Sequence, residues 1–339
     1  MVRPLVDGPH TSPLSLLVFR SQDVVQSHLE PYCFCRSVST LMSKLTMMPT
    51  MNASIAVTAG IHLPQAGPAA SGEAMRQAAV LAEELGYSDV WVSDHVAVPT
   101  GADYPPSAYV FEPLVALTWV AAYTKRVGLG TTVLVLPMRN PLIVAKMVAS
   151  LDHLSGGRVI LGIAAGWLEA EFNALGVPFA ERGQRTDEAI DIMRRVWTDD
   201  HITADYPVHN AHFVSMRTKP QPQRHLPLWI GGHADVALRR AIAVGDGWHG
   251  AFLSPEQTAR RVKKLRAERP ESSFPISMRT RWDAVDDDND LILAEIDHYR
   301  EVGVTHFVPE PRQRTIDGYL RAMEMQADLF RRAGVMMVD

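Results

Sequence analysis

Two titratable residues, Asp94 and His95, stand side by side directly after an apolar run in the stretch DVWVSDHVAVP. The run Val90-Trp91-Val92 has the β-branched and aromatic character of a buried strand. A carboxylate and an imidazole at a strand end can act as general acid and base, or can hydrogen-bond to a polar ring. The structural alternative is an Asp that caps the next element and a His that bonds to the backbone. Their position at a strand end favours the functional interpretation.

A second candidate site is the pair Gly231-Gly232, which follows the apolar run LWI and precedes His233 and a helical pattern. Two glycines between a strand and a helix leave the backbone N–H groups at the helix N-terminus unshielded, and that geometry binds phosphate. A tight strand-to-helix turn would use the same two glycines. From these residues alone both interpretations stay open.

Further polar and aromatic residues follow the other predicted strands, and their mixture suits a large aromatic ligand with an anionic tail better than a bare metal ion. Trp167 stands at a strand end and is favoured as a ligand contact, whereas Glu171 is at least as consistent with anchoring a helix. No His-Glu-x-x-His motif occurs, and Cys33 and Cys35 are poorly spaced for zinc, so no metal site is predicted. The remaining candidates are His62, Thr131 to Pro137, Arg139, Asn140, Gly166, Glu169, Trp248, His249, Arg279, Arg281, Trp282 and His306 to Glu310.

The elements that must position these residues repeat along the chain from Ala53 onward, as an apolar strand followed by an amphipathic helix. Near-continuous apolar strands are typical of a parallel sheet with both faces covered. Eight such units predict a (β/α)8 TIM barrel of the α/β class, with an insertion at 201–227 between the fourth helix and the fifth strand. A doubly wound sheet is the alternative, although no Gly-x-Gly-x-x-Gly follows the first strand. In a barrel the candidates would meet at the C-terminal strand ends.

The composition narrows the class of protein. The 339 residues are 47% hydrophobic and carry a formal net charge of −5, so no basic surface for nucleic acid is expected. No apolar run is long enough to span a bilayer, and two cysteines form no disulfide framework. We therefore predict a cytoplasmic protein that binds neither nucleic acid nor membranes. Residues 1–52 lack a sustained period and are predicted to be a disordered extension preceding the barrel domain at 53–339.

A resemblance to a known family runs from about Ala53 to the C-terminus. It is carried by three segments: GYSDVWVSDH, LGTTVLVLPMRNPLIVAKMVASLDHLSGGRVILGIAAGWLEAEFNALGVPFAERGQRTDEAI and PLWIGGHADVALRRAIAVGDGWHGA. In this order they resemble the bacterial luciferase-like superfamily. Within it, they most resemble the oxidoreductases that depend on a deazaflavin, coenzyme F-420.

The resemblance implies a barrel that binds a flavin or deazaflavin at the strand ends. Asp94 and His95 would lie near the polar edge of the ring, with His95 as the proton-transfer group. A cis peptide bond is implied at Thr132-Val133, behind the ring, and a phosphate cradle at the two glycines. The cofactor-binding residues would be Asp94, Thr132, Val133, Trp167, Gly231, Gly232 and His233, and the catalytic residues His95 and Asp94.

Two positions depart from the sugar-phosphate dehydrogenases of that family. Those enzymes carry a Glu, used as a proton donor, where this chain has Trp167. They carry a Trp in the loop after the His, where Pro99 stands here. The differences argue against a sugar-phosphate substrate and indicate a more apolar pocket.

The predicted function is hydride transfer between coenzyme F-420 and an organic small molecule, since deazaflavins do not usefully activate oxygen. The first alternative is an FMN-dependent monooxygenase that receives reduced flavin from a partner reductase. The second is a catalytically silent flavin-binding protein, because a fold does not determine a function. A barrel enzyme without a flavin is the third. The resemblance also implies a homodimer.

Overall fold

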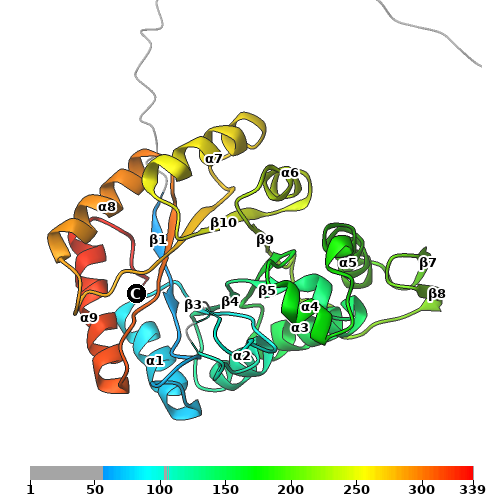
Figure 1. The fold of residues 1–339 in the computed structure, drawn as a ribbon, viewed down its shortest axis with the longest axis horizontal. Helices are drawn as coiled ribbons and strands as arrows, with labels where there is room; N and C mark the ends of the chain where they lie inside the picture. The colour runs from blue at the N-terminus through cyan, green and yellow to red at the C-terminus, as the bar shows by residue number, and fades with distance from the viewer. Residues whose placement is uncertain (1–55, 103–104, 106, 339) are drawn as a thin grey trace, which may run out of the picture. The chain divides into compact units, whose positions relative to one another are not determined.

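The structure, a computed structural model, describes residues 56–102, 105 and 107–338. The extension predicted at 1–52 lies outside the described residues. Within them, parallel strands form a closed barrel that helices surround (Figure 1), which confirms the predicted fold class. The barrel strands are β1 Thr58–Ala59, β2 Ile61–His62, β3 Asp89–Val92, β4 Gly128–Thr131, β5 Leu134–Val135, β6 Val159–Ala164, β9 Leu228–Gly231, β10 Gly247–Ala251, β11 Ile276–Thr280 and β12 His306–Pro309.

The barrel closes through its first strand, which Gly60 divides into β1 and β2. The order of paired strands runs from β1 through β12, β11, β10, β9, β6, β4 and β3 to β2, and every pair in it is parallel. Gly60 donates its backbone N–H to Phe307, while Leu63 donates to Trp91 on the other side. A Cβ on Gly60 would lie 1.9 Å from an Asp89 oxygen, so only glycine fits at this position.

The helices begin where the sequence supplies caps and early prolines. Ser71 caps α1, Asn140 caps α3 ahead of Pro141, and Ser254 forms a capping box with Gln257 at α7. Gly86 ends α1 in the left-handed conformation. The helices are α1 Gly72–Leu85, α2 Pro113–Ala121, α3 Pro141–Ser155, α4 Glu169–Ala174, α5 Arg182–Thr198, α6 Asp235–Val244, α7 Pro255–Glu268, α8 Asn289–Glu301 and α9 Ile316–Arg332.

The third strand differs from the single long strand that its apolar run predicts. It is interrupted between β4 and β5, and a short 3-10 turn, Leu136–Met138, follows β5. The interruption falls at the cis peptide bond between Thr132 and Val133. The insertion contains an antiparallel hairpin, made of β7 Ile202–Tyr206 and β8 Ala211–Met216.

The interior of the barrel is filled by aromatic rings and a few polar groups. Trp91 stacks on His249 with the ring centres 5.1 Å apart and the planes nearly parallel, and it also packs against Trp229 and His306. A Cβ on Gly130 would lie 2.4 Å from the Trp91 ring, so this glycine makes room for the indole. The barrel is therefore a packed core, and a ligand has to bind at one of its ends.

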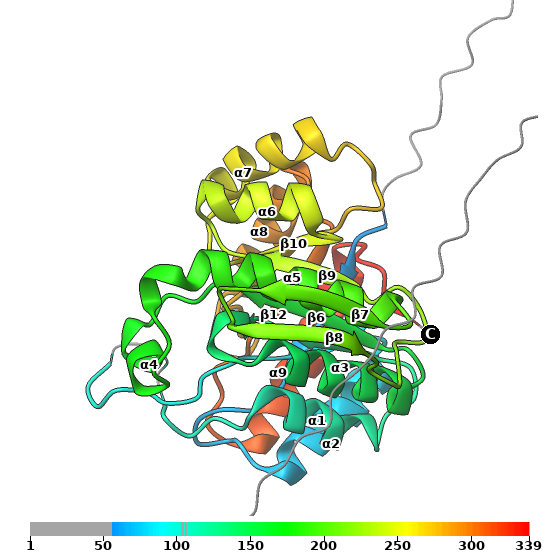
Figure 2. The same ribbon diagram turned by 90° about the vertical axis from the view of Figure 1, so that its right-hand side faces the viewer.

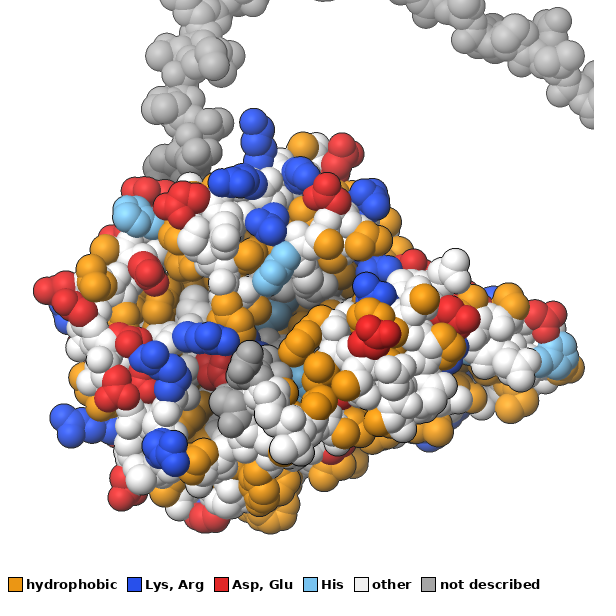
Figure 3. Space-filling view, in the orientation of Figure 1, with side chains coloured by type: hydrophobic (Ala, Val, Ile, Leu, Met, Phe, Trp, Pro, Cys, Tyr) orange, Lys and Arg blue, Asp and Glu red, His pale blue; other side chains and the backbone are white. Residues whose placement is uncertain are grey.

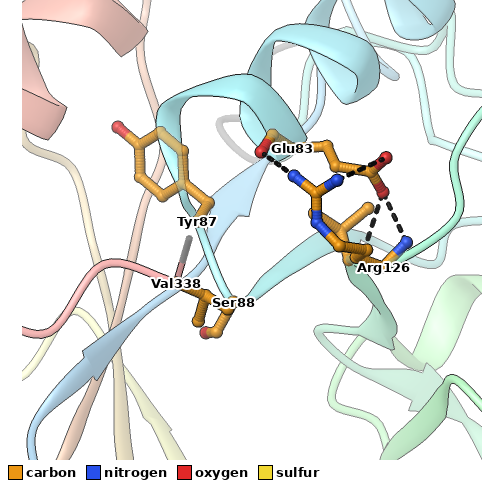
Figure 4. A pocket seen from close by; sticks show the side chains of 6 residues that line it. Glu83, Tyr87, Ser88, Arg126 and Val338 are labelled. Atoms are coloured by element: carbon orange, nitrogen blue, oxygen red, sulfur yellow. Dashed lines mark hydrogen bonds and ion pairs between the residues drawn. The ribbon is translucent and has the colours of Figure 1, made fainter.

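The two ends of the barrel differ. The short helix α4 lies at one end, after β6, and the chain terminus lies at the other (Figure 2). Near the terminus is a cavity of about 20 Å³, between Glu83, Tyr87, Ser88, Arg126, Val127 and Val338 (Figure 4). That volume holds about one water molecule, so this cavity is too small for an organic cofactor.

Candidate active site

The predicted site residues gather at the end of the barrel that carries α4, as expected for C-terminal strand ends. The space-filling view shows this face hollowed at its centre, where hydrophobic and histidine side chains line the hollow and charged side chains lie beside it (Figure 3). We call this hollow the mouth. The loops after β3, β5, β6, β9, β10, β11 and β12 lead into it.

His95 forms a pair with Glu171, which lies in α4, 76 residues further along the chain. The imidazole Nδ1 and Oε2 of Glu171 are 3.1 Å apart, and the other carboxylate oxygen accepts the backbone N–H groups of Val96 and Ala97. Burial by itself raises the pKa of Glu171, but the hydrogen bonds from His95 and the two backbone N–H groups outweigh it and lower the pKa. A neutral imidazole held in this way donates from Nδ1 and carries its basic lone pair on Nε2.

Trp167 lies beside this pair, with its ring edge-on to the imidazole at a centre-to-centre distance of 6.5 Å. Its side chain is 57% exposed, which is unusual for tryptophan in a packed domain. A ligand bound in the mouth beside His95 would meet this exposed indole. The sequence is consistent with Glu171 as a helix anchor, and in the structure its carboxylate holds both the loop after β3 and His95.

Asp94 has contacts that differ from those of its neighbour. Its buried carboxylate accepts the backbone N–H of Val135 at 2.8 Å and a hydrogen bond from Nη2 of Arg139 at 2.6 Å. Arg139 also pairs with Glu112 at 2.9 Å. These contacts tie the end of β3 to β5, so Asp94 acts as an anchor in this structure, and its predicted proton role stays a prediction.

The peptide bond between Thr132 and Val133 is cis, which confirms the expectation from the resemblance. The Thr132 hydroxyl lies 2.7 Å from Nε2 of His249, and its carbonyl accepts a hydrogen bond from Arg279 at 3.0 Å. A Cβ on Gly231 would lie 2.8 Å from Cγ1 of Val133. One role of Gly231 is therefore to let the Val133 side chain pack close to β9.

Gly232 and His233 form the turn into α6. Gly232 has φ +117°, a conformation that disfavours any side chain, and a Cβ there would lie 2.9 Å from Ala237. α6 has no side-chain cap, because its N-cap residue is Ala234. The Nε of Arg261 donates to the His233 carbonyl at 3.1 Å. An uncapped helix N-terminus beside an arginine is suited to a phosphate group.

A buried ionic group borders the mouth from β11 and β12. Nη2 of Arg279 pairs with Glu310 at 2.8 Å. Burial, with Arg279 nearby, lowers the pKa of His62 to about 4, so this ring is neutral at pH 7. His62 donates from Nδ1 to the Leu63 carbonyl, and its Nε2 accepts from the Ser93 hydroxyl at 2.8 Å.

Two other candidates at strand ends, Trp282 and Trp248, have side chains that pack within the fold. Trp282 packs between Phe307 and Phe330 in the helix layer and donates to Glu295. Trp248 is buried and donates its N–H to the Gly232 carbonyl. Position at a strand end, used alone, therefore predicts more site residues than the structure supports. A signal that would separate these residues is the strand period of two, which places alternate side chains outside the barrel.

The described part of the chain contains no helix long and apolar enough to cross a membrane. Within the same residues, no group of three or more His, Cys, Asp or Glu side chains is arranged to hold a metal ion.

The fold and the mouth define a TIM barrel with a polar strand-end site, and comparison with known proteins gives its family. The chain belongs to the luciferase-like monooxygenase family, whose sequence model matches residues 51–335. It is 37% identical over 209 residues to an uncharacterised protein of Mycobacterium tuberculosis, covering 57% of this chain and 71% of that protein.

Two further comparisons name a cofactor. The chain is 36% identical over 175 residues to an F-420-dependent glucose-6-phosphate dehydrogenase of Kineococcus radiotolerans, covering half of each protein. The fold matches an F-420-dependent secondary alcohol dehydrogenase, solved in complex with an F-420–acetone adduct, with a TM-score of 0.69. That alignment covers 82% of this chain and 99% of the other at 19% identity, so it supports the fold alone.

Proposed function

We propose that this protein is an oxidoreductase that transfers a hydride between coenzyme F-420 and an organic substrate. The observation that carries the proposal is the His95–Glu171 pair in the mouth. It holds an oriented imidazole at the end of the barrel where the resemblance implies that a ring cofactor would bind. The F-420-dependent relative, matched over half its length, supports this choice of cofactor.

The residues of the mouth fit a deazaflavin. Thr132 and Val133 would lie behind the ring, and Asp94, although engaged with Arg139, would lie near its polar edge. The uncapped N-terminus of α6, with Gly232 and His233, has the donors that a phosphate needs. The cofactor, when bound, supplies the hydride chemistry, and the protein supplies its binding and orientation.

The residues of this chain have separate tasks in the proposed reaction. Glu171 holds His95 in one tautomer, so that Nε2 takes a proton from the substrate as the hydride leaves, or returns it in the reverse direction. The exposed Trp167 indole, edge-on to the imidazole, would form an apolar wall beside His95. Because Trp167 and Pro99 replace residues of the sugar-phosphate dehydrogenases, we propose an apolar substrate such as an alcohol or carbonyl compound.

The test is to measure which of the two cofactors the protein binds more tightly. Purified full-length protein is titrated with F-420 and with FMN, and binding is followed by the quenching of cofactor fluorescence. We expect F-420 to bind more tightly. Micromolar binding of FMN with no affinity for F-420 would instead support the FMN-dependent monooxygenase, the activity in the family's own description. Cofactor binding without turnover of any alcohol or carbonyl compound would support the silent binding protein.

We also propose that the protein is a cytoplasmic homodimer formed through α2 and α3. The outer faces of these helices expose Val115 (61%), Trp119 (43%) and Met147 (37%), which lie in or beside one apolar groove. Exposed apolar patches of this kind mark interaction surfaces. Sedimentation velocity should give a dimer that Trp119→Lys dissociates, while Leu291→Lys on α8 leaves it intact. A monomeric wild type would refute this assembly.

A further inference from the structure

A continuous chain of buried hydrogen bonds runs from the mouth into the barrel core. The Thr132 hydroxyl lies 2.7 Å from Nε2 of His249, and Nδ1 of His249 lies 2.9 Å from the Ser277 hydroxyl. The same hydroxyl lies 2.9 Å from Nδ1 of His306, whose Nε2 lies 3.0 Å from Asp89. All five side chains are buried. We call this series the inner chain.

The barrel places the members of the inner chain with strand register. His249, Ser277 and His306 occupy paired positions on the adjacent strands β10, β11 and β12. Asp89, at the start of β3, reaches His306 across the barrel, although the two are 217 residues apart in sequence. The indole of Trp91 stacks on His249 and packs against His306, which shields the chain from water.

The lower end of the inner chain is a carboxylate. Burial by itself raises the pKa of Asp89, but His306 and the hydrogen bonds from Ser88 and Trp91 outweigh it and lower the pKa. Asp89 therefore stays ionised at neutral pH and can only accept hydrogen bonds. This fact sets the direction of every other bond in the inner chain.

Two arrangements of protons satisfy the whole inner chain. When His306 is neutral it donates from Nε2 to Asp89, so Ser277 donates to His306, His249 donates to Ser277, and Thr132 donates to His249. When His306 carries a second proton, its Nδ1 donates to Ser277 and all the bonds above it reverse. Thr132 then accepts from His249, and its own proton points elsewhere.

We propose that the inner chain is a proton relay and store for the mouth, in which the His306–Asp89 pair holds one proton and the Thr132 hydroxyl delivers it. This inference rests on the proposed function, because the Thr132 hydroxyl would serve the cofactor ring while His95 serves the substrate. With the proposed cofactor bound, transfer of a hydride to its ring would add one negative charge at the mouth. The stored proton balances that charge.

The proton balance of the relay closes. Four bonds to hydrogen break: those of the Thr132 hydroxyl, His249 Nε2, the Ser277 hydroxyl and His306 Nδ1. Four form: one to the acceptor in the mouth, and those of the Thr132 hydroxyl, His249 Nδ1 and the Ser277 hydroxyl. One proton leaves His306, which becomes neutral beside the Asp89 carboxylate. The reverse sequence returns the proton when the hydride leaves.

Burial, more than the neighbouring charges, keeps His249 neutral, so this ring passes a proton on and does not hold an extra one. Burial, together with His306 and Arg279, lowers the pKa of His249 to about 3. Its ring is therefore neutral at pH 7 and changes only which nitrogen carries hydrogen. His233 also disfavours a charge on His249, and Asp89 favours one. His306 is the ring in direct contact with the carboxylate.

The test follows the histidine tautomers by NMR in full-length protein labelled with ¹⁵N-histidine, titrated over the pH range in which the fold is stable. In the wild type we expect the N–H signal of His249 to move from Nδ1 to Nε2 as His306 gains its second proton. In Ser277→Ala this coupling should be lost completely. Ser155→Ala, which removes a buried hydroxyl from α3, should behave as the wild type.

A second measurement adds F-420 to the same samples. Binding in the mouth should shift the His306 resonances of the wild type, and the shift should disappear in Ser277→Ala. If that variant does not fold, Thr132→Val interrupts the inner chain at its upper end and should abolish the same shift. A His249 tautomer that stays constant in the wild type, or that still follows His306 in Ser277→Ala, would overturn the relay. Failure of F-420 to bind would overturn only the proposed function, because the pH titration needs no cofactor.

Discussion

The replacement of Asp94 by Asn separates an anchoring role from a catalytic one. The Asp94 side chain is fully buried and receives hydrogen bonds from Arg139 and from the backbone of Val135. An Asn can still accept one of these bonds, but its amide NH₂ would face the guanidinium, where two donors oppose each other. The end of β3 would then lose its tie to β5.

The size of the effect follows from burial. Removing one partner of a buried ion pair costs about 3–5 kcal/mol, because the other charge stays behind without its partner. Arg139 is partly exposed and keeps Glu112 at 2.9 Å, so we expect about 2–4 kcal/mol for Asp94→Asn. For a domain of this size that corresponds to a fall in the melting temperature of roughly 3–7 °C.

Thermal denaturation at one fixed scan rate measures this fall. The matched control is Asp200→Asn, since Asp200 pairs with Arg217 and Lys219 on the surface. Ion pairs on the surface are screened by solvent and contribute little, so the control should melt close to the wild type. If Asp94→Asn also melts close to the wild type, Asp94 does not anchor the strand end, and our interpretation of its contacts is wrong.

Three further predictions concern the mouth. Glu171→Gln should lower stability at pH 7 by roughly 1–3 kcal/mol relative to the exposed control Glu169→Gln. Because folding lowers the pKa of Glu171, the ionised carboxylate stabilises the fold at pH values above its unfolded pKa of about 4.3, and this stabilisation is lost as the pH falls through the folded pKa. If the stability difference between wild type and Glu171→Gln, measured by urea denaturation, did not change with pH, this reasoning would be contradicted. His95→Asn should reduce hydride transfer by roughly 10²–10⁴-fold with little change in F-420 affinity, and retained turnover would exclude it as the proton group. Gly232→Ala should weaken F-420 binding and lower the free energy of unfolding by about 1–3 kcal/mol. The control Gly101→Ala, where a new Cβ meets no other atom, should lower it by about 1 kcal/mol. Equal losses of stability in the two variants would show that the Gly232 turn has no special role.

Local patterns in the sequence were sufficient to predict the barrel and the end of the barrel at which its candidate site lies. The alternation of apolar strands with amphipathic helices is a local property, and caps such as Ser71 and Ser254 depend on neighbours within one turn. Parallel strands then bring their C-terminal ends to one edge. Asp94, His95 and Trp167 could therefore be assigned to one mouth before their contacts were known. The cis bond at Thr132-Val133 came from the family motif, not from any local physical pattern.

Only the tertiary structure decided which groups pair with which. His95 meets Glu171 across 76 residues, and His306 meets Asp89 across 217, because the barrel closes with a particular register. No local period encodes that closure. It depends on how glycines such as Gly60 and Gly130 admit neighbouring side chains inside the barrel. The sequence by itself therefore determined where chemistry could occur, while the closed barrel decided that His95 is held by Glu171 and that Asp94 is an anchor, since packing across the barrel sets those distances.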